Sequence, residues 1–266
     1  MLEDPDSFKA IKSHLSSKTL QDIEGLDPSL YGFGREECCG SIPESLPNSM
    51  KMDKEHVMLA STMPFTQWSK LTDNVPHYTE LHRSLQKDSP RASLTVCETN
   101  DDECVLRFRT NPNTGCFEIT QYSISDPVST PWTEKGTLQV DRTDECFIFV
   151  CSHLSRDKRC GYCGAVLVDL LRQAVLRKMG EDGAKRVSVL PCAHIGGHIY
   201  AGNVILYRKS GGVAFGLFKP SDVDTLVDAV ASGTDEIPES LRPRIRGQLY
   251  SNIPVTKESN QKCAIM

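Results

Sequence analysis

The hydrophobic pattern of the second half of the chain predicts alternating strands and helices. An unbroken apolar run at 146–150 is typical of a strand buried on both faces, and a second strand is expected at 186–190. Between them, seven apolar residues recur at helical spacing and predict a helix over 164–179, which Gly180 can end. These residues are Val166, Leu167, Leu170, Leu171, Ala174, Val175 and Met179.

A hairpin and a last helix complete this half. Two short apolar runs at 204–208 and 213–218 flank a turn-forming Lys-Ser-Gly-Gly sequence at 209–212. The last helix is expected at 221–233, between a serine and a glycine. The order strand, helix, strand, followed by strand, strand, helix, is that of the thioredoxin fold. Residues 143–233 are therefore predicted to form a thioredoxin-like domain.

The first half carries a weaker version of the same pattern. The expected elements are a strand at 56–61, a helix at 79–87, a strand at 92–98, and a hairpin of 104–109 with 116–120 around a turn at 111–115. The predicted fold class is therefore α/β. It combines a thioredoxin-like C-terminal domain with a smaller, degenerate, thioredoxin-like half at residues 51–135.

The segments outside these two halves have a different composition. Residues 1–50 contain a short helical pattern followed by many Gly, Pro and Ser residues, and we expect this segment to be peripheral. Residues 124–142 have the composition of a linker, with two prolines, a glycine and mixed polar side chains. Residues 234–266 are expected to form a C-terminal tail.

Two cysteines and two histidines follow the two buried strands of the second half. Cys151 comes directly after the first strand, and Cys160 lies nine residues further on. His194 and His198 follow the second strand. Because the loops after parallel strands lie at the same edge of a sheet, these four side chains are expected to converge. Thiolates and imidazoles are the side chains best suited to a soft or borderline metal.

The sequences around these residues resemble the two signatures of a known family. They are C-S-H-L-S-R-D-K-R-C-G-Y-C-G at 151–164 and H-I-G-G-H-I-Y-A-G-N at 194–203. Both resemble the sucrase/ferredoxin-like proteins, which are also called thioredoxin-like [2Fe-2S] ferredoxins. Residues 56–62 with Trp68 resemble the N-terminal half of that family, and residues 246–248 faintly resemble its C-terminal end. Two signatures in the right order make a specific match.

The resemblance implies that Cys151, Cys160, His194 and His198 hold a [2Fe-2S] cluster. The protein would then be a carrier of single electrons rather than a catalyst of substrate chemistry. Two imidazoles in place of two thiolates make such a cluster less negative and easier to reduce, as in Rieske centres. The spacing suggests that the cysteines hold one iron and the histidines the other. Because a ligand imidazole has a second nitrogen, we expect electron uptake to be coupled to protonation.

Two other functions stay open. The sequence Cys-Gly-Tyr-Cys at the start of a helix is also typical of a thiol-disulfide oxidoreductase, which would use Cys160 and Cys163. That function leaves Cys151 and both histidines unexplained. A structural zinc ion could bind the same four ligands, although the separation from Cys163 to His194 is too long for a zinc finger. We expect Cys163 and Cys192 to lie outside the set of ligands.

Composition excludes some classes of partner. The formal charge is −5, from 30 Lys and Arg against 35 Asp and Glu, and no basic stripe points to nucleic acid. There is no apolar run of about 18 residues, so no membrane-spanning helix is expected. The acidic start at 1–6 suits neither a secretory signal nor a transit peptide. Eleven cysteines are then more typical of reduced thiols or metal ligands, and we predict a cytoplasmic protein.

The sequence says less about the redox partners of the protein and its association with membranes. An electron carrier needs a redox donor, such as a reductase, and an acceptor, and the sequence names neither. Arg156, Lys158 and Arg159 could guide an acidic redox partner or could form a solvated loop. The chain ends Cys-Ala-Ile-Met, which fits the prenylation signal at Cys263 and would give weak association with a membrane.

Overall fold

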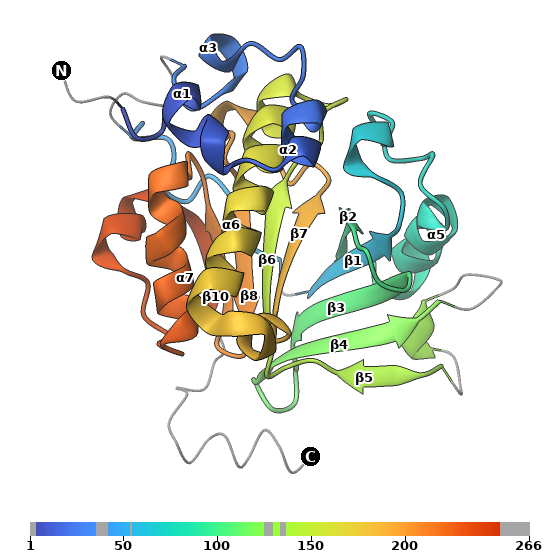
Figure 1. Ribbon diagram of the computed structural model, residues 1–266. Helices are drawn as coiled ribbons and strands as arrows, with labels where there is room; N and C mark the ends of the chain where they lie inside the picture. Colours follow the sequence, from blue (N-terminus) through green and yellow to red (C-terminus); the bar gives the residue numbers. More distant parts are fainter. Residues whose placement is uncertain (1–3, 36–41, 54, 125–129, 134–136, 251–266) are drawn as a thin grey trace.

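A ten-stranded mixed sheet forms the centre of the protein in the computed structural model, which describes residues 4–35, 42–53, 55–124, 130–133 and 137–250 (Figure 1). The strand order is β10-β9-β8-β6-β7-β2-β1-β3-β4-β5. The strands are β1 Glu55–Ser61, β2 Ser93–Glu98, β3 Cys104–Thr110, β4 Phe117–Ser123, β5 Gln139–Asp141, β6 Cys146–Cys151, β7 Val187–Cys192, β8 Val204–Arg208, β9 Gly211–Phe215 and β10 Ile245–Tyr250.

The structure describes α-helices from both halves of the chain and from its N-terminal segment. They are α1 Phe8–Ile11, α2 Ser17–Asp22, α3 Pro28–Tyr31, α5 Tyr78–Asp88, α6 Lys158–Ala184 and α7 Val223–Ala231. In Figure 1, α6 and α7 cover the strands of the second half and α5 lies beside those of the first. Among the described residues, no helix is both long enough and apolar enough to cross a bilayer.

The second half has the predicted thioredoxin-like sheet. β6 and β7 are parallel, β8 runs antiparallel to β6, and β9 runs antiparallel to β8. The strand order β7-β6-β8-β9, with α6 connecting β6 to β7, follows from the alternation of apolar runs and one long helical stripe. The prediction of a mixed α/β fold is confirmed.

The first half repeats this arrangement in a smaller form. β1 and β2 are parallel, β3 is antiparallel to β1, and β4 is antiparallel to β3, which gives the order β2-β1-β3-β4. The two halves join where β2 pairs with β7, in antiparallel register at Cys97 and Cys192. One continuous sheet therefore contains two related halves. The exact domain boundaries, at 51–135 and 143–233, stay predictions.

The sheet curls so that the two halves also pack face to face. Phe108 of β3 stacks on Tyr207 of β8 with ring centroids 4.4 Å apart, although four strands separate β3 from β8 in the sheet. Neighbouring strands lie about 4.8 Å apart, so a flat sheet could not make this contact. Phe147 and Phe149 of β6 complete the aromatic layer on this face. The helices pack on the other face, in a separate apolar core.

Helix α6 begins earlier and ends later than the apolar stripe indicated. The side chain of Asp157 accepts a hydrogen bond from the backbone N–H of Arg159, and this cap starts the helix at Lys158. Cys160 and Cys163 therefore lie in its first turns rather than in a loop. Gly180 does interrupt the helix, with φ +66°, but helical backbone resumes and continues to Ala184.

The segments at the two ends contribute more than we expected. Ile11, Leu15, Ile23 and Phe33 are buried in the helix-side core, so part of the segment predicted to be peripheral covers α6. Strand β10 lies in the predicted tail and β5 in the predicted linker. Neither strand has a continuous apolar run, which is why the sequence pattern missed them. Cys263, the proposed prenylation site, lies outside the described residues.

Candidate metal centre

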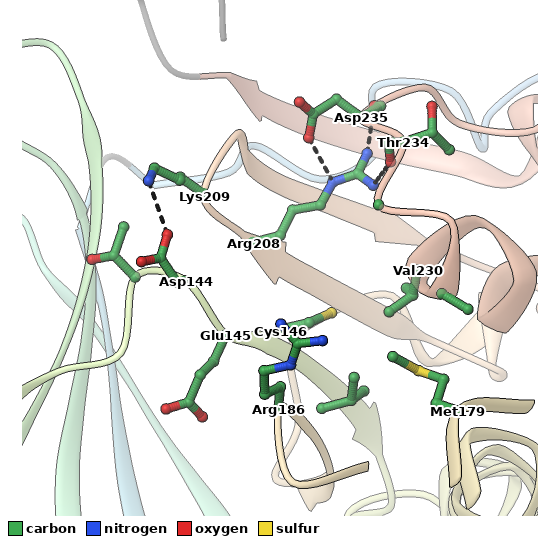
Figure 2. A pocket seen from close by; sticks show the side chains of 14 residues that line it. Asp144, Glu145, Cys146, Met179, Arg186, Arg208, Lys209, Val230, Thr234 and Asp235 are labelled. Atoms are coloured by element: carbon green, nitrogen blue, oxygen red, sulfur yellow. Dashed lines mark hydrogen bonds and ion pairs between the residues drawn. The ribbon is translucent and has the colours of Figure 1, made fainter. Parts of the chain in front are cut away.

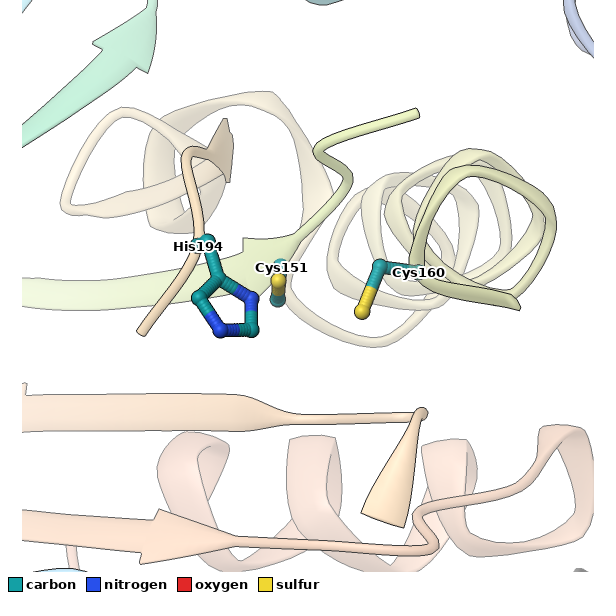
Figure 3. Close-up of side chains that lie close together, drawn as sticks. All are labelled: Cys151, Cys160 and His194. Carbon is teal, nitrogen blue, oxygen red and sulfur yellow. The ribbon is translucent and has the colours of Figure 1, made fainter. Parts of the chain in front are cut away.

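Three of the four predicted ligands come together in the structure. Cys151 ends β6, Cys160 lies in the first turn of α6, and His194 follows β7. Figure 3 shows their side chains converging, and the ligand atoms of all three lie within 4.8 Å of one another. β6 and β7 run parallel with Cys151 opposite Cys192, so both loops leave the sheet at the same edge. The strand order predicted that all four side chains converge, and this close group contains Cys151, Cys160 and His194 but not His198.

His198 lies beside His194 on the same loop. Their ring centroids are 5.9 Å apart, and the planes are tilted by 35°. Gly196 and Gly197 between them have φ values of +84° and +66°, which favour glycine. The two glycines turn the backbone so that the second histidine returns to the first.

The two sides of this site differ in their access to water. Cys151 and Cys160 are 1% and 0% exposed, whereas His194 is half-buried and His198 is exposed. A group held here would therefore have its sulfur ligands inside the protein and its imidazole ligands toward solvent. Protons and a redox partner could reach it from the histidine side.

The two thiols have opposite pKa shifts. A hydrogen bond between them is the largest influence on each, and it lowers the pKa of Cys151 well below its usual value while it raises that of Cys160. Burial raises both, and the ring of His194 further lowers the pKa of Cys151. One thiolate is thus favoured by the protein itself, and the thiolate is the form that binds metals.

His194 provides a test of whether a metal group fits. Its Nδ1 atom is buried and has no hydrogen-bond partner among the described residues. The ring does interact with the Cys151 thiol, but Nδ1 makes no hydrogen bond of ordinary geometry within the described residues, so its lone pair is available to a metal. The donor set of two sulfurs and imidazole nitrogen suits iron–sulfur clusters and zinc alike.

His153 is a residue beside the candidate site that the sequence analysis did not single out. It is 2% exposed, and its Nδ1 atom accepts a hydrogen bond from the backbone N–H of His194 at 3.1 Å. Its Nε2 atom donates to the carbonyl of Ser69 at 2.9 Å, and its ring packs edge-on against Trp68. His153 therefore ties the predicted ligand to the first half of the chain. Its position inside the first signature was the available signal.

Cys163 is not part of this group of ligands. It is fully buried, and its Sγ atom lies 3.3 Å from Nη1 of Arg35 and 3.5 Å from the carbonyl oxygen of Tyr31. Burial raises the pKa of this thiol, although Arg35 opposes the effect. A buried thiol with a raised pKa is a poor nucleophile, which weakens the case for a Cys160–Cys163 dithiol. Cys192 is also buried with a raised pKa, on the far side of the sheet.

A cavity of about 220 Å³ opens beside His194. Its lining includes His153, Arg156 and Lys70, so it lies between the two halves of the chain. Of the other cations predicted near the cysteines, Arg159 pairs with Asp157 and Lys158 lies over the ring of Tyr31. Both side chains therefore make contacts of their own at the start of α6.

A second cavity, of about 270 Å³, lies at the other end of β6 (Figure 2). Cys146 lines it, whereas Cys151 ends the same strand at the metal centre. Two of its cations are already paired, since Arg208 donates to backbone carbonyls of 234–235 and Lys209 pairs with Asp144. This cavity is separate from the converging ligands.

Comparison with known proteins finds relatives among fungal proteins. The chain is 27% identical over 209 residues to "Altered inheritance of mitochondria protein 32" of Debaryomyces hansenii, which covers 77% of this chain and 74% of that protein. The protein of the same name in Meyerozyma guilliermondii is 35% identical over 40% of this chain and 37% of its own length. "Actin patches distal protein 1" of Saccharomyces cerevisiae is 33% identical over 32% of this chain and 29% of its own length.

A solved structure and a family pattern also match. The solved structure is a thioredoxin-like [2Fe-2S] ferredoxin from Aquifex aeolicus, with 19% identity and a TM-score of 0.31 over 42% of this chain and 99% of that one. The pattern of the sucrase/ferredoxin-like family matches residues 46–243, which is most of the chain and includes both signatures. The chain belongs to the sucrase/ferredoxin-like family.

Proposed function

We propose that this protein carries single electrons on a [2Fe-2S] cluster held by Cys151, Cys160, His194 and His198. The observation that carries the proposal is the meeting of two buried thiols with a buried, unpaired imidazole nitrogen. Membership of the sucrase/ferredoxin-like family supports it. When bound, the cluster would supply a site that gains and loses one electron.

The chain's own residues would set how that electron is received. Cys151 and Cys160 would hold the group on the buried side, where water is excluded. His194 would bind through Nδ1, which has no hydrogen-bond partner among the described residues. Where the bound ring has lost its Nε2 proton at alkaline pH, Nε2 would take the proton back as the group gains an electron. His198 lies on the exposed side and offers a second imidazole for the same role.

We also propose the kind of redox partners and the cellular location of this protein. The exposed histidine side and the cavity beside His194, with Arg156 and Lys70 in its lining, would admit an acidic redox partner. The donor would be a reductase and the acceptor a second redox protein. We propose a cytoplasmic location, with any membrane contact made through Cys263.

Colour and metal dependence separate this function from the two alternatives. The cluster-bearing protein is expected to be red-brown, with visible absorption that dithionite removes. A zinc protein would be colourless, and a dithiol enzyme would reduce disulfides without metal. The three donors lie close enough to hold a single zinc ion, so zinc is the stronger of the two competitors.

A pair of variants tests the ligands directly. Cys151→Ser removes a proposed ligand, and Cys146→Ser makes the same change at the other end of β6. The first is expected to abolish the visible absorption and the second to keep it. Equal absorption in both variants would contradict the proposed site.

A further inference from the structure

Arg246 is a buried cation placed against the loop that carries both histidines, which we call the histidine loop (residues 193–203). Its side chain is 2% exposed. It occupies the irregularity in β10 where the register with β9 shifts between Ile245 and Gly247. A bulge takes a residue out of the strand ladder, which allows its side chain to be redirected.

The guanidinium fixes the turn between the histidines. Nη1 of Arg246 donates to the carbonyl oxygen of Gly196 at 3.0 Å and to Oδ1 of Asn203 at 2.7 Å. Nδ2 of Asn203 donates in turn to the carbonyl oxygen of Gly197 at 3.0 Å. Both glycine carbonyls between His194 and His198 are thus held by one network that begins at Arg246.

The surrounding residues leave room for this side chain. A Cβ atom at Gly197 would lie 2.2 Å from Nη2 of Arg246, and one at Gly216 would lie 2.6 Å from its Cδ atom. The guanidinium also lies 5.1 Å from the ring centroid of Tyr200, and its Nε atom donates to Oγ of Ser49 at 3.0 Å. Three segments outside β10 therefore surround this side chain: the histidine loop, residue 216 and residue 49.

The charge of Arg246 has no carboxylate partner within ion-pair distance in the described part of the chain, because its three hydrogen-bond acceptors are neutral oxygens. Burial lowers the pKa of Arg246, whereas Tyr200, Cys151 and Cys160 raise it. A buried charge is costly unless an opposite charge compensates it. The Cys151 thiolate, which the site favours, is the negative group that would compensate this charge.

We propose that Arg246 positions the histidine loop and supplies the counter-charge that favours the reduced state of the centre. This inference rests on the proposed function. Reduction adds one electron, and so one negative charge, to the group held by the cysteines and histidines. A fixed cation on the protein side stabilises that added charge more than it stabilises the oxidised state.

Two substitutions of Arg246 separate its role in positioning the histidine loop from the effect of its positive charge. Arg246→Gln removes both the charge and the guanidinium fork, whereas Arg246→Lys keeps the charge but cannot span Gly196 and Asn203 with one ammonium group. Arg242→Gln is the matched control, since it removes an exposed arginine in the preceding turn.

The midpoint potential of the iron-loaded protein measures whether the positive charge of Arg246 favours the reduced state. Arg246→Gln is expected to lower the equilibrium constant for reduction at least tenfold, which is about 59 mV for one electron. Arg246→Lys is expected to lower it less, and Arg242→Gln to leave it unchanged. A potential in Arg246→Gln equal to that of Arg242→Gln would overturn the charge role.

Hydrogen exchange of residues 193–203 in metal-free protein measures whether Arg246 holds the histidine loop in place. Both Arg246 variants are expected to exchange at least tenfold faster there than Arg242→Gln, with unchanged exchange in β6. Equal exchange in all three proteins would overturn the positioning role. If wild-type protein binds no iron and sulfide, the proposed function fails, while the exchange result still decides whether Arg246 holds the loop.

Discussion

The backbone N–H of His194 donates a hydrogen bond to Nδ1 of His153 at 3.1 Å. Because Nε2 of His153 donates to Ser69 in the other half of the chain, the proposed ligand is anchored to both halves of the sheet. The second signature thus depends for its geometry on a residue of the first. We therefore infer that His153 positions His194 in the candidate metal centre.

We expect His153→Ala to weaken the centre without removing a ligand. The N–H of His194 loses its acceptor, and removing a residue that hydrogen-bonds to a ligand commonly costs 10–100-fold in metal affinity. Iron retained after competition with a chelator measures the loss. His82→Ala, at an exposed position on α5, is the control and should keep wild-type retention. Equal retention in both variants would show that His153 does not support the centre.

A serine scan of α6 separates the cluster from the dithiol. We expect Cys160→Ser to lose bound iron and Cys163→Ser to keep it, because Cys160 meets Cys151 and His194 whereas Cys163 contacts Arg35. Iron content per chain is the measurement. If disulfide reductase activity is present and either substitution abolishes it, the oxidoreductase function would replace the electron carrier.

Electron uptake is expected to depend on pH. A bound His194 ring that has lost its Nε2 proton would take it back to offset the charge of the added electron, so the midpoint potential should fall as the pH rises from neutral to alkaline. For one proton per electron the limiting slope is about 59 mV per pH unit. Potentiometric titration measures it, with a Cys163→Ser protein as the control. A potential that stays flat over this range would exclude the proton coupling.

His56 should make stability depend on pH far from the metal centre. It is buried, with Nδ1 2.9 Å from the hydroxyl of Tyr207 and Nε2 2.8 Å from Oγ1 of Thr95, and burial lowers its pKa to about 4. An unfolded histidine has a pKa of about 6.5, so the unfolded chain takes up the proton first as the pH falls. The stabilisation is therefore complete above about pH 6.5 and is lost down to about pH 4.

Urea unfolding of wild type and His56→Gln near neutral pH and near pH 4.5 measures this effect. The wild type should lose about 2 kcal/mol more than the variant between the two conditions. Taking the difference cancels the other titrating groups. Identical losses in the two proteins would mean that His56 is not held neutral by burial.

The sequence predicted the sheet because its central strands carry continuous apolar runs. Residues 146–150 and 186–190 led to the correct parallel pair, and that pair led to the convergence of Cys151, Cys160 and His194. Strand β10 was not predicted because it has no such run. It is held in the sheet by its pairing with β9. A strand that is stabilised by pairing with a distant part of the chain need not show this in its own sequence.

The residues that support the ligands were not predicted either, because their contacts also join distant parts of the chain. Arg246 lies 50 positions from Gly196, and His153 lies 41 positions from His194. Neither contact follows from helical or strand periodicity. The ligands themselves were predictable because metal chemistry restricts them to few residue types, whereas a supporting hydrogen bond can come from almost any polar side chain.

Iron, acid-labile sulfide and zinc measured per chain in anaerobically purified protein test the central claim most directly. Two irons and two sulfides per chain, with little zinc, are expected for the proposed cluster. One zinc per chain without sulfide, or protein that contains no metal at all, would contradict the assignment of Cys151, Cys160, His194 and His198 as cluster ligands.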